Sequence, residues 1–205
     1  MGDSIYQNDR WVQKYERNIA GTRANGAPPR EVQVDHLWSR ILKYYFEQED
    51  TAPDFDVQRE SYTTDQGQKR TNVAVANFRG EPPREHKVLV VEAKRPLADR
   101  NNERRTPHQN DFNTLKNQLL RYLIQARGND APSGAVQTVY GVVAIGMWAQ
   151  FVQLPRNREN LLPAGNRNTR APLAGSWTFH VRDDADVIHA LINGWVRTIQ
   201  DGLNT

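Results

Sequence analysis

The most informative stretch of this chain is Lys87-Val88-Leu89-Val90-Val91-Glu92-Ala93-Lys94-Arg95-Pro96. Its nearly continuous apolar run is typical of a central strand that is buried on both faces of a sheet. Because successive side chains of a strand point to opposite faces, Glu92 and Lys94 should emerge on the same face where this strand ends. A carboxylate beside an amine at a strand end suits the binding of a metal ion and the positioning of a water against a phosphodiester.

Length and composition fit one polar globular domain. The chain has 205 residues, of which 38% are hydrophobic and 25% charged, and no stretch approaches the eighteen apolar residues of a membrane span. The first eleven residues lack the apolar core of a signal peptide, and the absence of cysteine excludes disulfides and thiolate metal sites. We therefore expect an intracellular protein, cytoplasmic or nuclear, without a membrane partner. Its net charge of +3 allows an anionic partner without requiring one.

The spacing of apolar residues predicts the elements before and including the central strand. Residues 1–30 are expected to form an N-terminal extension and a linker rich in Gly and Pro, with a short helix around Trp11 and Tyr15. From Glu31 the apolar period changes to that of a helix of about four turns. Three strands follow, over 55–63, 71–78 and 88–94, and their short connections favour an antiparallel meander.

The second half of the chain is predicted to contain two helices and three strands. We expect helices over 112–126 and 187–199, and strands over 136–145, 148–154 and 177–181. Residues 155–175 are predicted to form a loop. Residues 31–205 should therefore form a single α/β domain, with a mixed sheet flanked by helices and an extra C-terminal strand and helix.

The order α-β-β-β-α-β, with Glu92-Ala93-Lys94 ending the third strand, resembles the PD-(D/E)xK nuclease superfamily over roughly residues 31–154. The resemblance implies a restriction-endonuclease-like fold that uses Mg²⁺ or Mn²⁺ to hydrolyse phosphodiester bonds, with DNA favoured over RNA and the choice between them left open. In that superfamily's pattern Glu92 binds the cation and the carbonyl of Ala93 supplies a second oxygen. Lys94 holds the attacking water or stabilises charge on the phosphate. The competing interpretation is a solvent-exposed Glu92–Lys94 ion pair at a strand end.

The resemblance assigns roles to two further residues. Glu31, on the first helix, would complete the metal site, although an acid there also complements the helix dipole. Asp35 follows it one helical turn later. Gln118 and Tyr122 match the Gln-x3-Tyr pattern of the helix after the third strand, where Gln118 would lie near Lys94 and help to place the substrate strand. Tyr122 could equally be part of the core.

The superfamily's first acid is expected where this chain has Asn72. Asn offers a neutral oxygen in place of a carboxylate, so it should bind a divalent cation more weakly than Asp. Three explanations stay open: a natural pseudo-nuclease that binds nucleic acid, an engineered inactivating change, or another acid that takes over the role. Asp56 and Glu60, on the neighbouring strand, are the candidates for the third explanation.

Basic and aromatic side chains around these motifs could contact phosphates or bases. Those expected to bind nucleic acid are Lys69, Arg70, Arg95, Arg104, Arg105 and Tyr122. Phosphate contacts would give affinity without sequence specificity, and the alternative is an ordinary solvated loop. The sequence therefore predicts a metal-dependent DNA nuclease whose activity depends on position 72. The alternative is a non-catalytic nuclease-fold module that binds nucleic acid or a protein partner, and the oligomeric state is undetermined.

Overall fold

The computed structural model describes residues 6–21, 29–47, 55–59, 72–79, 84–98, 105–130, 138–164 and 177–203. The helices among them are α1 (Arg10–Ala20), α2 (Glu31–Phe46), α3 (Gln109–Asp130) and α4 (Ala185–Leu203), preceded by the short 3₁₀ helix η1 (Tyr6–Asn8). The strands are β1 (Phe55–Arg59), β2 (Val73–Arg79), β3 (Arg84–Lys94), β4 (Val139–Ile145), β5 (Trp148–Leu154), β6 (Leu162–Pro163) and β7 (Thr178–His180).

The seven described strands form one mixed sheet in the order β1-β2-β3-β4-β5-β6, with β7 also paired to β5. The pairs β1–β2 and β2–β3 are antiparallel, which confirms the predicted meander. Strand β4 is parallel to β3, and α3 makes the connection that a parallel pair requires. The register between β2 and β3 shifts at Val88, an extra residue of β3 that forms a bulge.

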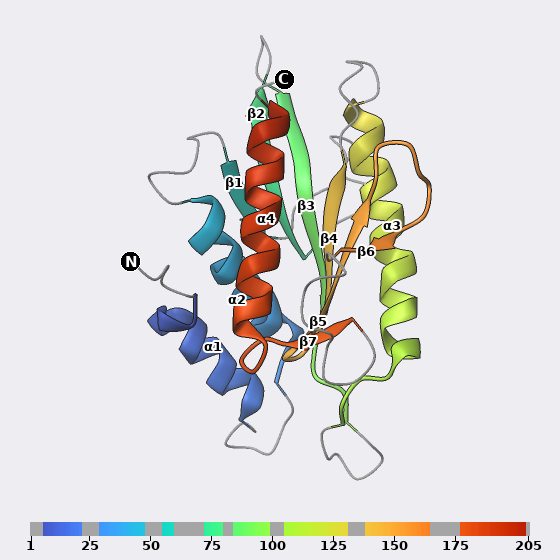
Figure 1. Ribbon diagram of the computed structural model, residues 1–205. Helices are drawn as coiled ribbons and strands as arrows, with labels where there is room; N and C mark the ends of the chain where they lie inside the picture. Colours follow the sequence, from blue (N-terminus) through green and yellow to red (C-terminus); the bar gives the residue numbers. More distant parts are fainter. Residues whose placement is uncertain are drawn as a thin grey trace.

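Helices cover both faces of the sheet, so the molecule has three layers (Figure 1). Helix α3 packs on one face, where Val90 of β3 joins its apolar cluster. Helices α1, α2 and α4 pack on the other face, where Leu89 and Val91 join the larger cluster. The alternation of these β3 side chains between two apolar layers confirms β3 as a central strand buried on both faces.

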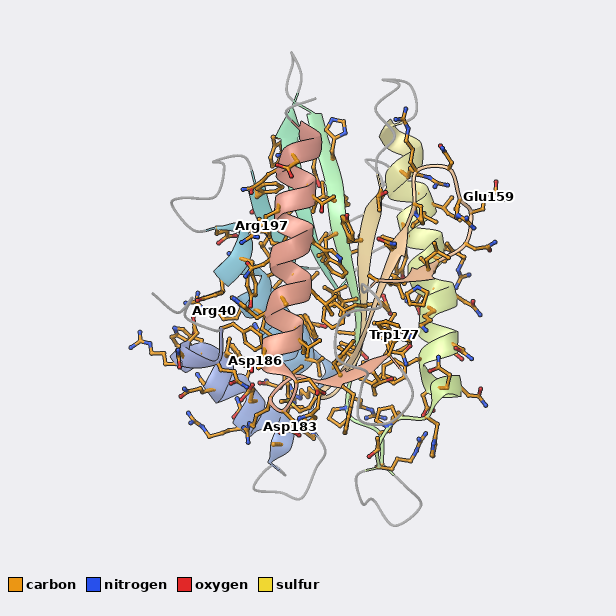
Figure 2. All side chains as sticks on the ribbon, viewed as in Figure 1. Arg40, Glu159, Trp177, Asp183, Asp186 and Arg197 are labelled. Carbon is orange, nitrogen blue, oxygen red and sulfur yellow. The ribbon has the colours of Figure 1, made fainter. Side chains whose placement is uncertain are left out.

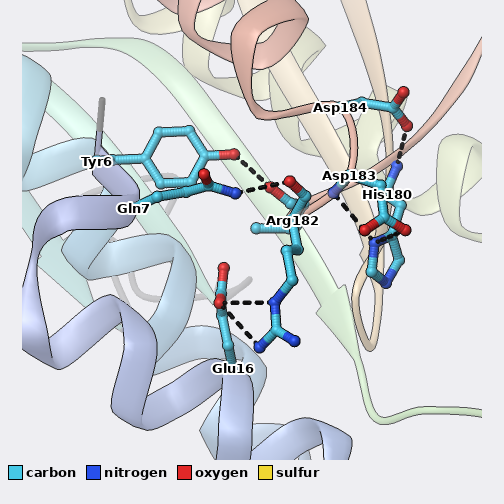
Figure 3. A network of polar contacts seen from close by, with 8 residues as sticks. Tyr6, Gln7, Glu16, His180, Arg182, Asp183 and Asp184 are labelled. Carbon is cyan, nitrogen blue, oxygen red and sulfur yellow. Dashed lines mark hydrogen bonds and ion pairs between the residues drawn. The ribbon is translucent and has the colours of Figure 1, made fainter. Parts of the chain in front are cut away.

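The N-terminal segment packs against the turn that leads into α4. Asp9 caps α1 by accepting hydrogen bonds from the backbone N–H groups of residues 11 and 12. The Tyr6 hydroxyl donates to the carbonyl of Val181 at 2.6 Å, and Arg182 forms an ion pair with the buried Glu16 at 3.2 Å (Figure 3). Side chains of α1 thus belong to the main core, whereas residues 22–28 of the expected linker lie outside the described residues.

The C-terminal half follows the predicted order with longer helices. Helices α3 and α4 extend beyond the predicted 112–126 and 187–199 because polar end residues continue a helix without adding to its apolar period. Asp183 and Asp186 flank the start of α4, where acidic side chains complement the helix dipole (Figure 2). The predicted loop 155–175 contains the two-residue strand β6. None of the described helices is long and apolar enough to cross a membrane.

Candidate functional site

Glu92 is a buried carboxylate near the end of β3. Its position in the strand places it on the same face as Val90, which packs against α3. The residue is 1% exposed, and neither carboxylate oxygen has a hydrogen-bond partner among the described residues. The Lys94 ammonium lies 3.3 Å from Oε1, an ion-pair distance without hydrogen-bond geometry. An exposed surface pair would leave Glu92 in water, so the burial of Glu92 argues against that interpretation.

Lys94 joins α2 to the end of β3. Its Nζ donates a hydrogen bond to Glu31 Oε1 at 3.0 Å, and it lies between Glu31 and Glu92. Glu31 occupies the first turn of α2, as expected. The structure therefore brings together three of the residues that the sequence predicted for the site, although 63 positions separate Glu31 from Lys94 in the chain.

Asn72 occupies the position directly before β2, beside the Glu92–Lys94 segment. Since Val73 pairs with Val91 in the antiparallel register, Asn72 lies across from Glu92. Its Oδ1 accepts a hydrogen bond from the backbone N–H of Ala93 at 3.0 Å. The Asn72 side chain also lies close enough to Asp35 of α2 to oppose the upward shift in the pKa of that carboxyl.

Asp35 is the site residue that was missing from the predicted set. It is 5% exposed on α2, and its Oδ1 has no hydrogen-bond partner among the described residues. The i, i+4 spacing from Glu31 was the available signal, because it places both acids on one side of the helix. That Asp35 would be buried beside Asn72 depends on how α2 crosses the sheet.

Burial and mutual repulsion control the ionisation of these acids. Burial raises the pKa of Glu92 to about 7, with Glu31 and Asp35 adding to the shift and Lys94 opposing it. Burial also raises the pKa of Asp35 to about 6, with a contribution from Glu31, while Arg59, Asn72 and Lys94 oppose the shift. Burial alone would lower the pKa of Lys94, but its carboxylate partners outweigh that effect and the net shift is upward.

The donor atoms of this cluster suit a hard divalent cation. Glu92 and Asp35 both offer buried carboxylate oxygens that lack a hydrogen-bond partner, and oxygen is the ligand that Mg²⁺ prefers. As the side chains stand in the described residues, no three His, Cys, Asp or Glu are grouped closely enough to hold a metal. The oxygen of Asn72 is engaged by Ala93, whereas Oδ1 of Asp35 has no hydrogen-bond partner among the described residues.

Gln118 and Tyr122 lie further along α3 than the resemblance implies. Gln118 donates a hydrogen bond to the Tyr122 hydroxyl at 2.9 Å, and Tyr122 is only 9% exposed. The neighbouring Leu119 packs at Gly141, in the middle of β4. Gln109, nine residues or roughly 13 Å earlier along the helix, is instead hydrogen-bonded to Gln150. Gln150 belongs to the same row of paired residues across the sheet as Glu92. The expected proximity of Gln118 to Lys94 is therefore absent from the contacts of the described residues, and burial leaves Tyr122 little surface for a nucleic acid.

The basic residues expected to bind nucleic acid have different surroundings. Arg95 is exposed directly after Lys94. Arg105 forms a two-pronged ion pair with Asp111 at 2.7 and 2.8 Å, so its guanidinium already has an anionic partner. Lys69, Arg70 and Arg104 lie outside the described residues.

Of the two acids considered as replacements for the missing Asp, only Asp56 belongs to the described residues, and it lies away from the site. Asp56 is exposed on β1, pairs with Ala76 in the register and accepts a hydrogen bond from Gln58. Position 76 lies four residues beyond position 72, roughly 13 Å along the strand. Glu60 lies outside the described residues.

Three layers, a mixed sheet and a buried acid cluster beside a lysine define an α/β protein with a candidate ion-binding site. No protein-family model matches the chain, and neither a curated protein nor a solved structure gives a significant match.

Proposed function

We propose that this protein is a metal-dependent nuclease that hydrolyses phosphodiester bonds in DNA. The order α2-β1-β2-β3-α3-β4 is the one expected for the PD-(D/E)xK superfamily, and the chain would be a divergent member of it. Glu92 and Asp35 would hold Mg²⁺ or Mn²⁺, with the carbonyl of Ala93 as a further oxygen. The cation, when bound, would polarise the phosphate and activate a water.

The observation that carries this proposal is the burial of Glu92 without a hydrogen-bond partner. Burying a carboxylate without a hydrogen bond costs several kcal/mol, which the Lys94 ammonium at 3.3 Å offsets only in part, and a second buried acid nearby increases that cost. Packing alone would favour apolar residues at both positions. Such clusters of acids with shifted pKa values are typical of functional sites, where a cation or substrate compensates the charge.

The other residues of the cluster have roles that follow from their contacts. Lys94 is a cation at neutral pH, so it would stabilise negative charge on the phosphate rather than accept a proton. Glu31 holds the Lys94 ammonium through the 3.0 Å hydrogen bond. Asn72 orients the backbone of Ala93 beside Asp35, a positioning role that a neutral amide performs without adding another charge.

Cleavage assays with matched variants test the proposal. Wild type, Glu92→Gln and Asp35→Asn are incubated with plasmid and with single-stranded DNA in Mg²⁺ or Mn²⁺, and EDTA serves as the blank. We expect cleavage by the wild type and a loss of about 100-fold or more in either variant, as for other charge-stabilising groups. Asp56→Asn removes an exposed acid outside the cluster and should cleave like the wild type.

A second candidate function is favoured by the engaged side chain of Asn72, whose oxygen already accepts from Ala93. It is a non-catalytic module that binds nucleic acid through salt-dependent contacts and needs no divalent cation. Adding Asn72→Asp to the assay separates the two. Cleavage by Asn72→Asp alone indicates an enzyme inactivated at this position, whereas an absence of Glu92-dependent cleavage in both proteins rejects the nuclease and leaves the module.

A further inference from the structure

A pocket of about 230 Å³ lies directly beyond the strand end that carries the acid cluster. The residues that line it include Pro96, Leu97, Arg105, Ile145, Trp148 and His180. Pro96 follows Lys94 by two positions, and the carbonyl of Lys94 accepts a hydrogen bond from Gly146 at 2.9 Å. The pocket and the candidate site therefore share the backbone of the β3 end.

A row of residues paired across adjacent strands connects the candidate site to the pocket. Lys94 pairs with Ile145, Ile145 with Trp148, and Trp148 with His180. Residues paired across adjacent strands point to the same face, and adjacent strands are about 4.8 Å apart. The backbone of Trp148 is therefore about 10 Å from that of Lys94, on the same side of the sheet.

The pocket wall is aromatic and held in place. The Trp148 ring packs edge-on against the His180 ring with centroids 4.8 Å apart. His180 Nδ1 lies 2.8 Å from a carboxylate oxygen of Asp183, and its backbone N–H donates to Asp184 (Figure 3). Because Asp183 occupies Nδ1, the ring nitrogen left to interact with a ligand is Nε2.

The size and chemistry of the pocket favour a small planar heteroaromatic ligand. Its volume is below the roughly 300–1,000 Å³ of pockets for drug-sized molecules, so it suits a single ring system. Apolar side chains and a tryptophan ring offer a surface for stacking, and His180 offers a polar contact for the ring edge. A phosphate is a poorer occupant, since the guanidinium of Arg105 is already paired with Asp111.

The geometry points to a pocket for one unpaired nucleobase, next to the phosphodiester that Lys94 contacts. This inference rests on the proposed nuclease function and adds its substrate class. A base inside a duplex is stacked on its neighbours and cannot enter such a pocket unless it is unpaired. The substrate would therefore be single-stranded or locally melted DNA, with affinity from stacking on Trp148 rather than from phosphate contacts alone.

Two pentamers with the same phosphates test this inference. Fluorescein-labelled pentathymidylate and a pentamer of abasic tetrahydrofuran units are titrated in EDTA with wild type, Trp148→Leu and Trp148→Phe. The wild type should prefer the thymidine pentamer by about tenfold, as expected for stacking of one base. Trp148→Leu should lose this preference without a change in affinity for the abasic pentamer. Trp148→Phe, which keeps an aromatic face, should retain most of it.

A second variant covers the case in which Trp148→Leu does not fold. Thr106→Phe fills the pocket from an exposed position and should also remove the preference for bases. Phe78→Leu changes an exposed aromatic residue at the end of β2 that lies away from Asn72, and it should leave the preference for bases intact. Equal affinity of the wild type for both pentamers, or an unchanged preference in Thr106→Phe, overturns the inference.

The outcomes also separate this inference from the nuclease proposal. Cleavage that depends on Glu92, together with a base preference that does not depend on Trp148, rejects the pocket and keeps the nuclease. A Trp148-dependent preference without Glu92-dependent cleavage keeps the base pocket and rejects the nuclease.

Discussion

The side-chain oxygen of Asn72 accepts a hydrogen bond from the backbone N–H of Ala93 at 3.0 Å. This contact ties the start of β2 to the end of β3 beside Glu92. The Asn72 side chain also lies near Asp35 on α2 and opposes the upward shift in its pKa, so one neutral side chain adjoins three elements of the candidate site. Position 72 therefore has a structural role that is independent of any metal.

Removal of this side chain should destabilise the protein. Asn72→Ala leaves the Ala93 N–H without its side-chain partner, and we expect a loss of about 1–3 kcal/mol in the free energy of unfolding. Asn72→Asp keeps an acceptor for Ala93 but adds a charge beside Asp35, so its loss should shrink as the pH is lowered. Urea unfolding at pH 5 and pH 8 in EDTA measures both. An Asn72→Ala protein as stable as the wild type would contradict the linking role.

Protonation of Glu92 should make stability depend on pH in the absence of a divalent cation. Its folded-state pKa of about 7 lies above the ordinary value of 4.5, so the folded state binds more protons than the unfolded state between these values. The free energy of unfolding should therefore fall as the pH rises from about 4.5 to about 7, by about 3 kcal/mol from this group.

Glu92→Gln provides the comparison for this pH dependence. The neutral amide cannot titrate, so the decline between pH 4.5 and 7 should be smaller, with Asp35 as the main remaining contributor. Thermal unfolding in EDTA across this pH range gives the two profiles. Parallel profiles for wild type and variant would show that Glu92 ionises normally.

Mg²⁺ should stabilise the folded protein through the acid cluster. A ligand that binds only the folded state adds about 2.7 kcal/mol at about 100 times its dissociation constant. The melting temperature of the wild type should therefore rise with Mg²⁺ at pH 8, and that of Glu92→Gln or Asp35→Asn should not. The exposed-acid variant Asp56→Asn should respond like the wild type, and an equal response from all four proteins would place the cation elsewhere.

The turn between β4 and β5 should accept only glycine at position 146. Gly146 has a φ of 59°, and a Cβ there would lie 2.9 Å from Cγ of Pro96 and 3.1 Å from its Cα. Gly146→Ala should lower the free energy of unfolding by about 1–3 kcal/mol and shift the β3 end that carries Lys94.

Gly194, in α4, has open space around its Cα, so Gly194→Ala should stabilise the helix by up to about 1 kcal/mol. Circular-dichroism melts compare the two variants.

Apolar periodicity predicted the elements that form the centre of this protein. The run that ends at Lys94 forms the buried β3, and the helical period from Glu31 forms α2. The strands predicted on either side of Gly146 are present as β4 and β5. These predictions hold because burial of an apolar face is decided by residues close together in the chain. Strand β6 was missed, since a two-residue strand has no period of its own.

The α/β class, the meander, and the emergence of Glu92 and Lys94 together at a strand end could all be predicted from local sequence patterns. Tertiary packing was needed to bury Asp35 beside Asn72 and to place Lys94 between Glu31 and Glu92. The same is true of the row from Lys94 to Trp148 and His180. Local patterns fix which face of an element is apolar, whereas distances between side chains far apart in the chain depend on how helices and strands pack.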